Sequence, residues 1–539
     1  MGKKIGGTLL LLVTAGFYWF LTWLLSLSWN LHFGITWVNI GIISIVVLVS
    51  IAIFVYRSDQ ELPAWLGAGV FIPIGIFVIS GIISLINSPV FSAKKYYNYV
   101  AERVTVIADN EEQSAFPNLI GSDGDTSNLP LYGSPEAIKR AETEMGKYPA
   151  LGSQFELLDE DLTSQSIKNS LSYVIPLQPK SVSKWDKDQG NNGYFIIDRN
   201  TGETKFIEHS LKYTTEAPFG SSAMRKLRSF DKHSGITDIS PEVDDNGVFH
   251  YVATTYDQSV MGSFKKVTGI LDMNAETGEI TKYGVDEIPS YVDRVYPEEF
   301  FSDYISYYGK YKHGFWNSKI GQKEVQEATE SFSVVYVDGV CYYYTGWTST
   351  GKHESSNGII MMNSRTGEIK LYQTYGIAES KAQGVAEGKV QEKKYSAGYP
   401  LLLKVAGEET YFSIMRDQNQ NLVGYAFVSY KDYTKVAVGE NLKEAQNMYI
   451  KALASGSTSE VFDDSVYETK EGEIDRISNE VVEGTTLYYV QLKGSNQMYS
   501  FYSKLEPKSV FAKAGDKISI KYIKTEAEVI AATEVDLKQ

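Results

Sequence analysis

The first ninety residues are the most hydrophobic part of the chain, and they contain three long apolar runs without any charged side chain. The runs cover residues 6–29, 38–56 and 64–86. A helix of about 20 apolar residues is long enough to cross the hydrocarbon core of a bilayer, which is about 30 Å thick. Trp23 and Trp29 lie at the end of the first run, which favours an uncleaved span over a signal peptide. The pattern therefore predicts a three-helix transmembrane anchor over residues 1–90, embedded in a lipid bilayer.

The positions of lysine and arginine predict the orientation of this anchor, because these residues concentrate on the cytoplasmic side of membrane proteins. Lys3, Lys4 and Arg57 fall on one side of the predicted helices, which favours a cytoplasmic N-terminus. Lys94 and Lys95, after the third run, favour the opposite orientation. We expect the first arrangement, which is a multi-pass protein of the cell membrane with a large extracytoplasmic C-terminal domain.

Residues 91–170 are expected to form a juxtamembrane helix and a connecting segment. Apolar positions at helical spacing predict a helix that continues out of the third run, through Tyr97, Val100, Ala101 and Val104. A further short helix is predicted after residue 133, with Ser134 as its N-cap and Pro135 in its first turn.

From residue 171 the chain changes to short, alternating, aromatic-rich runs separated by turn residues, which predict β-strands. Three segments are copies of one another: GYFIIDRNTGETKF, GILDMNAETGEITKY and GIIMMNSRTGEIKLY. Their shared pattern is G-x4-[DN]-x2-T-G-E, and successive copies are 76 and 89 residues apart. Each copy predicts a β-hairpin, because Asp or Asn caps the turn and glycine adopts a positive φ. The predicted turn residues are Asp198, Gly202, Asn274, Gly278, Asn363 and Gly367.

These segments resemble the PepSY family and related extracytoplasmic modules, in which a helix precedes an antiparallel sheet with a D-x-x-T-G-E-[IV] turn. The resemblance implies repeated helix-plus-sheet modules over residues 171–455. A fourth, degenerate copy is expected at residues 424–440, between helices at 379–394 and 441–455. The family implies a binding or regulatory role beside membrane proteins or peptidases, and it brings no catalytic residues.

Residues 466–539 contain five short predicted strands, which are typical of a small OB-like or SH3-like β-barrel. Barrels that bind single-stranded nucleic acid need a basic groove with interleaved aromatic side chains. Acidic side chains outnumber basic ones here, so a structural or protein-contact role is expected.

The chain contains no motif of a known catalytic or nucleotide-binding site, such as G-x-S-x-G, H-E-x-x-H, G-x-x-x-x-G-K-[ST] or C-x-x-C. Cys341, the sole cysteine, lies in a hydrophobic run and is expected to be a buried, inert thiol. Asp198 and Glu203 place two carboxylates in the first hairpin, but Asn replaces Asp in the other copies, which disfavours a metal site. No catalytic residue, cofactor or metal ligand is predicted.

One segment, residues 288–316, is unusually rich in aromatic side chains. Tyrosine and tryptophan are favoured at interfaces because they combine apolar area with a polar tip. Two interpretations are open: a helix packed on the sheet, or an interface with a partner. The candidate interface residues are Tyr304, Tyr307, Tyr308, Tyr311 and Trp316.

The charge balance separates the chain into two parts. The whole chain has a net charge of -15, and the first ninety residues contribute +1, which leaves -16 for the remainder. Such an acidic surface repels nucleic acid, so no nucleic-acid partner is expected. We expect a membrane-anchored α+β protein that acts as a non-enzymatic extracytoplasmic scaffold and assembles with itself or with another cell-envelope protein. Two alternatives stay open: a regulatory binding module for a peptidase or cell-envelope enzyme, and a cell-wall or carbohydrate-active enzyme without a recognised motif.

Overall fold

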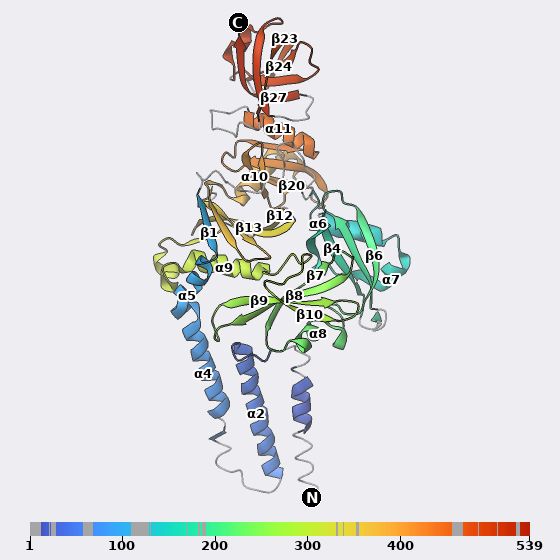
Figure 1. The fold of residues 1–539 in the computed structure, drawn as a ribbon, viewed down its shortest axis with the longest axis vertical. Coiled ribbons are helices and arrows are strands. Elements are labelled where there is room, and N and C mark those ends of the chain that lie inside the picture. Colours follow the sequence, from blue (N-terminus) through green and yellow to red (C-terminus); the bar gives the residue numbers. More distant parts are fainter. Residues whose placement is uncertain are drawn as a thin grey trace.

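The computed structural model of the protein describes residues 12–20, 22, 28–57, 68–69, 71–108, 129, 131–168, 170–181, 184–185, 190–329, 332–337, 339–351, 355–454, 467–482, 485–503, 505–523 and 529–538. The molecule is elongated (Figure 1). Helices lie at its N-terminal end, β-sheets with covering helices lie in the middle, and a β-barrel lies at its C-terminal end.

The N-terminal helices differ from the predicted anchor. Within the described residues, α2 (Gly34–Arg57) is the single helix that is long and apolar enough to cross a membrane. α4 (Phe71–Asn87) is shorter, and it meets that requirement only when joined to α5 (Pro89–Ala101), which bends away from it by 47°. The bend occurs at Pro89, because proline has no N–H with which to continue the hydrogen-bond ladder of α4. The prediction of three transmembrane helices is therefore wrong, because apolarity alone did not reveal where the helices end.

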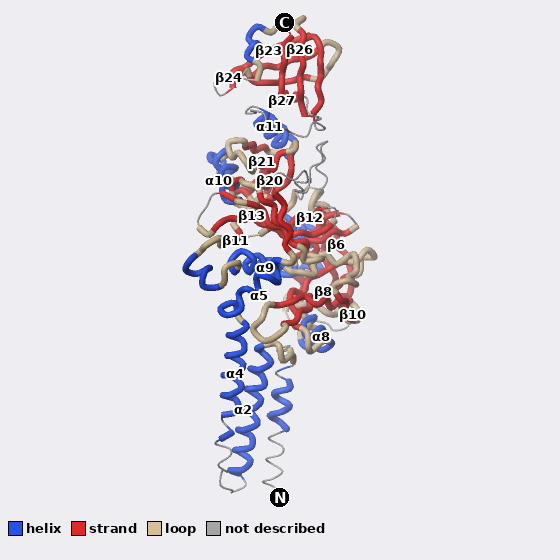
Figure 2. The backbone as a smooth tube through the Cα atoms, turned by 60° about the vertical axis from the view of Figure 1, so that its left-hand side comes forward, coloured by secondary structure: helices blue, strands red, loops and turns tan. Residues whose placement is uncertain are grey.

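The first apolar run is described only in part. Residues 12–20 and 22 are helical, whereas residues 6–11, 21 and 23–27 of this run lie outside the described residues, as do 58–67, 109–128 and 455–466. α2 and α4 lie side by side in both views (Figures 1 and 2). The Phe77 ring of α4 contacts α2 at Gly41, where any side chain would collide with it.

The ends of these helices that lie beside the nearest β-sheet are hydrogen-bonded to it and to its loops. The Trp29 N–H donates a hydrogen bond to the Lys232 carbonyl over 2.8 Å, and the Asn30 side chain donates to the Asp257 carboxylate over 3.0 Å. From α5, the Tyr96 hydroxyl donates to the Gly262 carbonyl over 2.6 Å. The helices are thus attached to the sheet at several points rather than by one flexible linker.

Four helix-and-sheet modules follow one another along the molecule. The first sheet contains β2 (Phe155–Leu157), β4 (Ser170–Pro179), β5 (Asn191–Asp198) and β6 (Thr204–Leu211), with β3 (Thr163–Ile167) paired to β4. Its helices are α6 (Ser134–Met145) and α7 (Pro149–Gln154). The second sheet contains β7 (Gly235–Val243), β8 (Phe249–Gln258), β9 (Lys265–Asn274) and β10 (Ile280–Gly284), and its helix is α8 (Ala223–Phe230).

The third sheet follows α9 (Glu298–Tyr311). It contains β11 (Gln326–Ala328), β12 (Ser333–Val337), β13 (Val340–Ser349), β15 (Gly358–Asn363) and β16 (Ile369–Gln373), and β1 (Val104–Ala108) joins its edge in parallel with β16. The fourth sheet contains β18 (Ser396–Ala397), β19 (Leu401–Val405), β20 (Glu408–Arg416), β21 (Leu422–Ser429) and β22 (Val436–Gly439). Its helices are α10 (Glu379–Lys389) and α11 (Leu442–Ala454), which lie where helices were predicted around the degenerate copy. The short strands β14 (Ser355–Ser356) and β17 (Gly376–Ile377) pair separately.

Neighbouring modules share hydrophobic cores. Tyr194 of β5 packs with Phe249 and Tyr251 of β8, so one core joins the first and second sheets. Tyr344 of β13 lies in the same core as Tyr411 of β20, so another joins the third and fourth sheets. Burial of apolar surface stabilises these contacts in the same way as it stabilises the interior of a single domain. Val252 of β8 and Tyr343 of β13 lie in a third shared core, so the four sheets form one continuous body.

A closed five-stranded barrel ends the chain. Its strands are β23 (Tyr467–Val482), β24 (Thr485–Leu492), β25 (Met498–Tyr502), β26 (Lys517–Ile523) and β27 (Val529–Lys538). Ile474, Val490 and Ile520 are fully buried in its core. Closure leaves no exposed sheet edge, which removes a site of unwanted strand pairing.

Two predicted helix boundaries need correction. The helix out of the third run ends at Ala101, and Val104 instead begins β1, where it pairs with Ile369 of β16. The N-cap of α6 is Gly133 rather than Ser134, because Glu136 accepts a hydrogen bond from the Gly133 N–H over 3.1 Å. At Val104, a strand pairing with a residue distant in sequence overrides the helical pattern. At Gly133, a hydrogen bond to Glu136 in the first turn of the helix sets the cap.

Candidate functional site

The predicted turn residues lie in three hairpins of the same geometry. The first joins β5 to β6, the second joins β9 to β10, and the third joins β15 to β16. In the first, the Asp198 carboxylate accepts hydrogen bonds from the backbone N–H groups of Asn200 and Thr201 over 2.9 and 2.7 Å. Asn274 and Asn363 accept the equivalent bonds with their amide oxygens.

The glycines of these hairpins share one backbone conformation, with φ of 71° at Gly202, Gly278 and Gly367. This left-handed conformation favours glycine, because a Cβ atom would clash with the backbone. The hairpins belong to three different sheets, so the turn residues are not brought together into one site. No group of three or more metal-ligating side chains is found within the described residues.

Four of the five aromatic interface candidates lie at the contact between α5 and α9. Tyr304 is 1% exposed, and its hydroxyl lies 3.2 Å from that of Tyr99. Tyr307 packs edge-on against Tyr96, with 4.9 Å between ring centroids, and Tyr308 stacks on Tyr97. Tyr311 lies beside the same cluster, with its ring 6.3 Å from that of Tyr96. These tyrosines therefore hold α5 on α9 of the third module.

Trp316, the fifth candidate, is different. Its side chain is 63% exposed, and Ile320 beside it is 79% exposed. Both lie at the end of the segment after α9, where η4 (Asn317–Gly321) closes the turn. Large apolar side chains exposed together are common at protein contacts.

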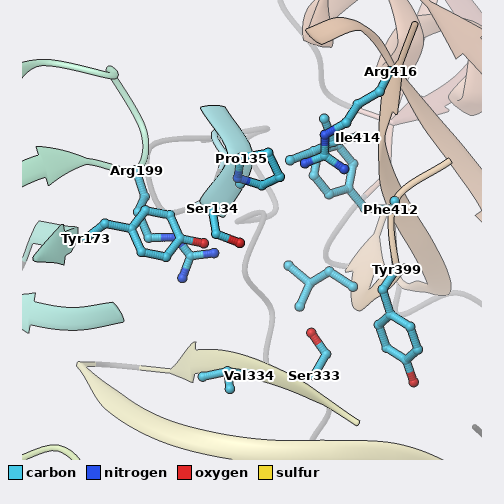
Figure 3. A pocket seen from close by; sticks show the side chains of 13 residues that line it. Ser134, Pro135, Tyr173, Arg199, Ser333, Val334, Tyr399, Phe412, Ile414 and Arg416 are labelled. Atoms are coloured by element: carbon cyan, nitrogen blue, oxygen red, sulfur yellow. The ribbon is translucent and has the colours of Figure 1, made fainter. Parts of the chain in front are cut away.

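A pocket of about 360 Å³ lies where the first, third and fourth modules meet (Figure 3). The first module contributes residues from the start of α6, from β4 and from the β5–β6 turn, and the others contribute β12 and the strands around β20. Its lining residues are Gly133, Ser134, Pro135, Tyr173, Arg199, Ser333, Val334, Gly398, Tyr399, Leu401, Phe412, Ile414 and Arg416. The volume is within the range of small-ligand sites, which is about 300–1,000 Å³.

Arg199 contributes a positive charge to this pocket, and this charge has no ion-pair partner among the described residues. Its guanidinium donates to the Ser164 hydroxyl over 2.8 Å and lies 4.6 Å from the centre of the Tyr173 ring. Its Nε atom is buried and has no hydrogen-bond partner among the described residues. Within the same residues, no ion pair joins it to a carboxylate. The guanidinium is held in place but retains capacity for an anionic partner.

Arg416, on the opposite side of the pocket, is already neutralised. Its Nε lies 2.6 Å from one oxygen of Glu136, and its Nη2 lies 3.1 Å from the other. Burial alone would raise the pKa of Glu136, but the hydrogen bonds and charge of Arg416 outweigh burial and lower it. This two-pronged ion pair joins α6 of the first module to β20 of the fourth.

The remaining walls are apolar or carry neutral hydroxyls. Val334, Leu401, Phe412 and Ile414 form the apolar part, and Ser134 and Ser333 contribute hydroxyls. Burial, with the nearby Glu379, raises the pKa of Tyr399, so its phenol remains protonated near neutrality. Among the described residues, the lining includes no carboxylate, histidine or cysteine side chain.

A second polar cluster lies apart from the pocket and is fully enclosed. Glu242 of β7 is 1% exposed, and neither of its carboxyl oxygens has a hydrogen-bond partner among the residues that the structure describes. Burial, with the neighbouring Asp293 carboxylate, raises the pKa of Glu242 well above its ordinary value. Burial also raises the pKa of Asp293 to about 6. Both acids thus bind a proton more tightly than free carboxyl groups do, and neither is among the residues that line the pocket.

Sequence reasoning did not find the pocket. Arg199 directly follows the turn residue Asp198, yet the turn pattern carries no sign that its neighbour faces a cavity. Arg416 and Glu136 are 280 residues apart and meet only in the folded chain. The one sequence signal was the capping pattern at Ser134–Glu136, which located the start of α6 to within one residue.

Comparisons with known proteins give no family for the chain. No family model matches it, and no curated protein matches it. Among solved structures, a variant of apocarotenoid oxygenase from Synechocystis is 9% identical, covers 52% of this chain and 50% of its own, and has a TM-score of 0.13. The polysaccharide lyase Uly1 is 11% identical, covers 52% and 46%, and has a TM-score of 0.16. The chain thus spans about half the length of these proteins, and the TM-scores are too low to define a shared fold.

Proposed function

We propose that the chain is a non-enzymatic, membrane-anchored scaffold whose PepSY-like modules stand outside the cytoplasm and assemble with a second copy of the chain. The observation that carries this proposal is the continuity of the body. Its modules share cores, and its base is bonded to the helices that include the apolar α2. A stiff body attached at its base suits a protein that positions others.

The contact between copies is assigned to the exposed pair Trp316 and Ile320. Tryptophan is among the residues that contribute most to protein contacts when an interface buries it. The flanking ion pair between Lys312 and Glu324, 2.6 Å apart, would form the polar rim around such a contact.

The test is the mass of the full chain after gentle solubilisation in detergent, measured by light scattering on a size-exclusion column. We expect a monodisperse homomer, and the variant Trp316→Ser with Ile320→Ser should shift it to the monomer. Tyr375→Ser is the matched control, because Tyr375 is 73% exposed elsewhere on the body. A monomeric wild-type protein would refute assembly with itself.

The junction pocket favours a second candidate, a regulatory binding module for a peptidase or another cell-envelope enzyme. A preformed cavity with an unneutralised arginine and apolar walls suits the capture of a segment of another protein. In this case the solubilised chain is a monomer that co-purifies with such an enzyme after crosslinking. A monomer without an associated enzyme would contradict both candidates. The pocket has no paired carboxylates, so it lends no support to a carbohydrate-active enzyme.

A further inference from the structure

We propose that the junction pocket binds the free C-terminal carboxylate of an extended peptide that ends in an apolar residue. This inference rests on the second candidate function, the binding module, and specifies its ligand. The carboxylate pairs with Arg199, and the last side chain lies against Leu401, Phe412 and Ile414.

The charge of the pocket favours a ligand that carries a single negative charge. Arg416 is neutralised by Glu136, so among the described residues of the lining the one uncompensated positive charge is that of Arg199. A carboxylate matches the planar fork of a guanidinium and accepts two parallel hydrogen bonds from it. A phosphate dianion would leave one negative charge unmatched, and the acidic chain as a whole repels polyanions.

The guanidinium is held ready for such a ligand. The Ser164 hydroxyl fixes one nitrogen, and the Tyr173 ring supports the planar group from the side. Ordering a long side chain on binding costs free energy, and a side chain that is already ordered avoids much of this cost. Arg199 is therefore a preformed anion site rather than a mobile surface arginine.

The shape of the pocket suits the end of a chain. Its volume of about 360 Å³ holds one or two residues rather than a long segment. One strand that lines it, β12, pairs on one side only among the described strands, with β13. Such a strand edge can accept the backbone of an extended peptide by β-augmentation.

The experiment compares two probe peptides on the full chain in detergent micelles by calorimetry. The first is acetyl-Gly-Ser-Gly-Ala-Val-Leu with a free carboxylate, and the second is the same peptide with a C-terminal amide. We expect the carboxylate form to bind and the amide form to bind at least tenfold more weakly. Arg199→Gln should remove this difference, while Lys205→Gln, which removes an exposed charge outside the pocket, should preserve it.

Equal affinity for the two peptides, or no binding of either, would overturn the inference. Displacement of the carboxylate peptide by inorganic phosphate at equal concentration would overturn it too, because the pocket would then prefer a phosphate. Failure of the binding-module function is distinguishable. If an enzyme still co-purifies with Arg199→Gln, the binding module stands and this pocket is not its contact; if the peptide binds but no enzyme co-purifies, the pocket assignment stands alone.

Discussion

Substitution of Asp161 tests how the burial of a carboxyl group changes the stability of this fold. It is the last residue of the short 3-10 helix η1 (Asp159–Asp161), between β2 and β3 of the first module, and its carboxylate accepts hydrogen bonds from the Thr215 hydroxyl over 2.6 Å and the Tyr251 hydroxyl over 3.1 Å. Burial is the main cause that raises the pKa of Asp161, the two hydrogen bonds oppose the rise, and the neighbouring Glu216 and Glu160 add to it, so that the pKa is raised from 3.8 to about 6. The perturbation is Asp161→Asn, which keeps an oxygen acceptor but removes the charge.

The sign and size of the change in the free energy of unfolding follow from proton linkage. Because the pKa is higher in the folded chain than the ordinary 3.8, the folded state holds the proton more tightly, and stability falls as the pH rises through about 6. The loss is complete above that pH and amounts to about 3 kcal/mol, at 1.36 kcal/mol for each tenfold change in proton affinity. Asp161→Asn should therefore be more stable than wild type by up to about 3 kcal/mol at pH 7.5 and equal to it near pH 4.

The assay is thermal unfolding of the full chain in detergent, followed by tryptophan fluorescence at pH 4.0 and pH 7.5. Each kcal/mol of this gain raises the melting temperature by roughly 1–2 °C in a body of more than about 300 residues, because the entropy of unfolding is about 2.1 cal/mol/K per residue. Asp231→Asn is the opposite control, because hydrogen bonds from Lys282 and Ser234 outweigh burial and lower the pKa of Asp231. It should destabilise the protein at pH 7.5. The reasoning is refuted if Asp161→Asn melts at or below the wild-type temperature at pH 7.5.

Three further outcomes are expected from the same structure. Glu136→Ala leaves Arg416 buried without its partner and should cost about 3–5 kcal/mol in a denaturant titration, while replacing both residues by Met should recover most of it. Gly202→Ala should cost about 1–2 kcal/mol because of its φ of 71°, whereas Gly220→Ala, with nothing within 4 Å of its Cβ position, should be neutral by the same titration. Cys341 is 0% exposed, and burial raises its pKa to about 11. Maleimide at pH 8 should therefore label this thiol only after unfolding, as measured by mass spectrometry. Labelling of the native chain would contradict the burial of Cys341.

The parts of the fold that could be predicted depend on residues close in sequence. The hairpin at Asp198–Glu203 is closed by side chains two or three positions from the backbone groups that they bind, so the sequence alone predicts it. The strands around it follow from alternation of apolar and polar residues. The barrel strands lie where turn residues separate alternating runs for the same reason.

The parts that could not be predicted depend on distant residues. Val104 continues a helical pattern, yet it joins a sheet because Ile369 offers a strand edge to pair with. Pro89 separates α4 from α5, and a search for apolar runs takes no account of such a break. The pocket requires Arg199 and Arg416 to face one cavity, and no local pattern relates two residues so far apart.

The attachment of the N-terminal helices to the second sheet has a consequence for how the protein can be divided. Phe33 packs on Tyr256, with ring centroids 5.5 Å apart, and Trp29 is bonded to Lys232. A fragment that begins after the apolar helices would expose the surfaces of the second sheet that these residues contact. Because these contacts join the helices to the second sheet, the sheets keep one direction relative to the helices. A partner bound to the sheets would therefore be held at a defined distance from the helices, and so at a raised effective concentration toward neighbours at that distance.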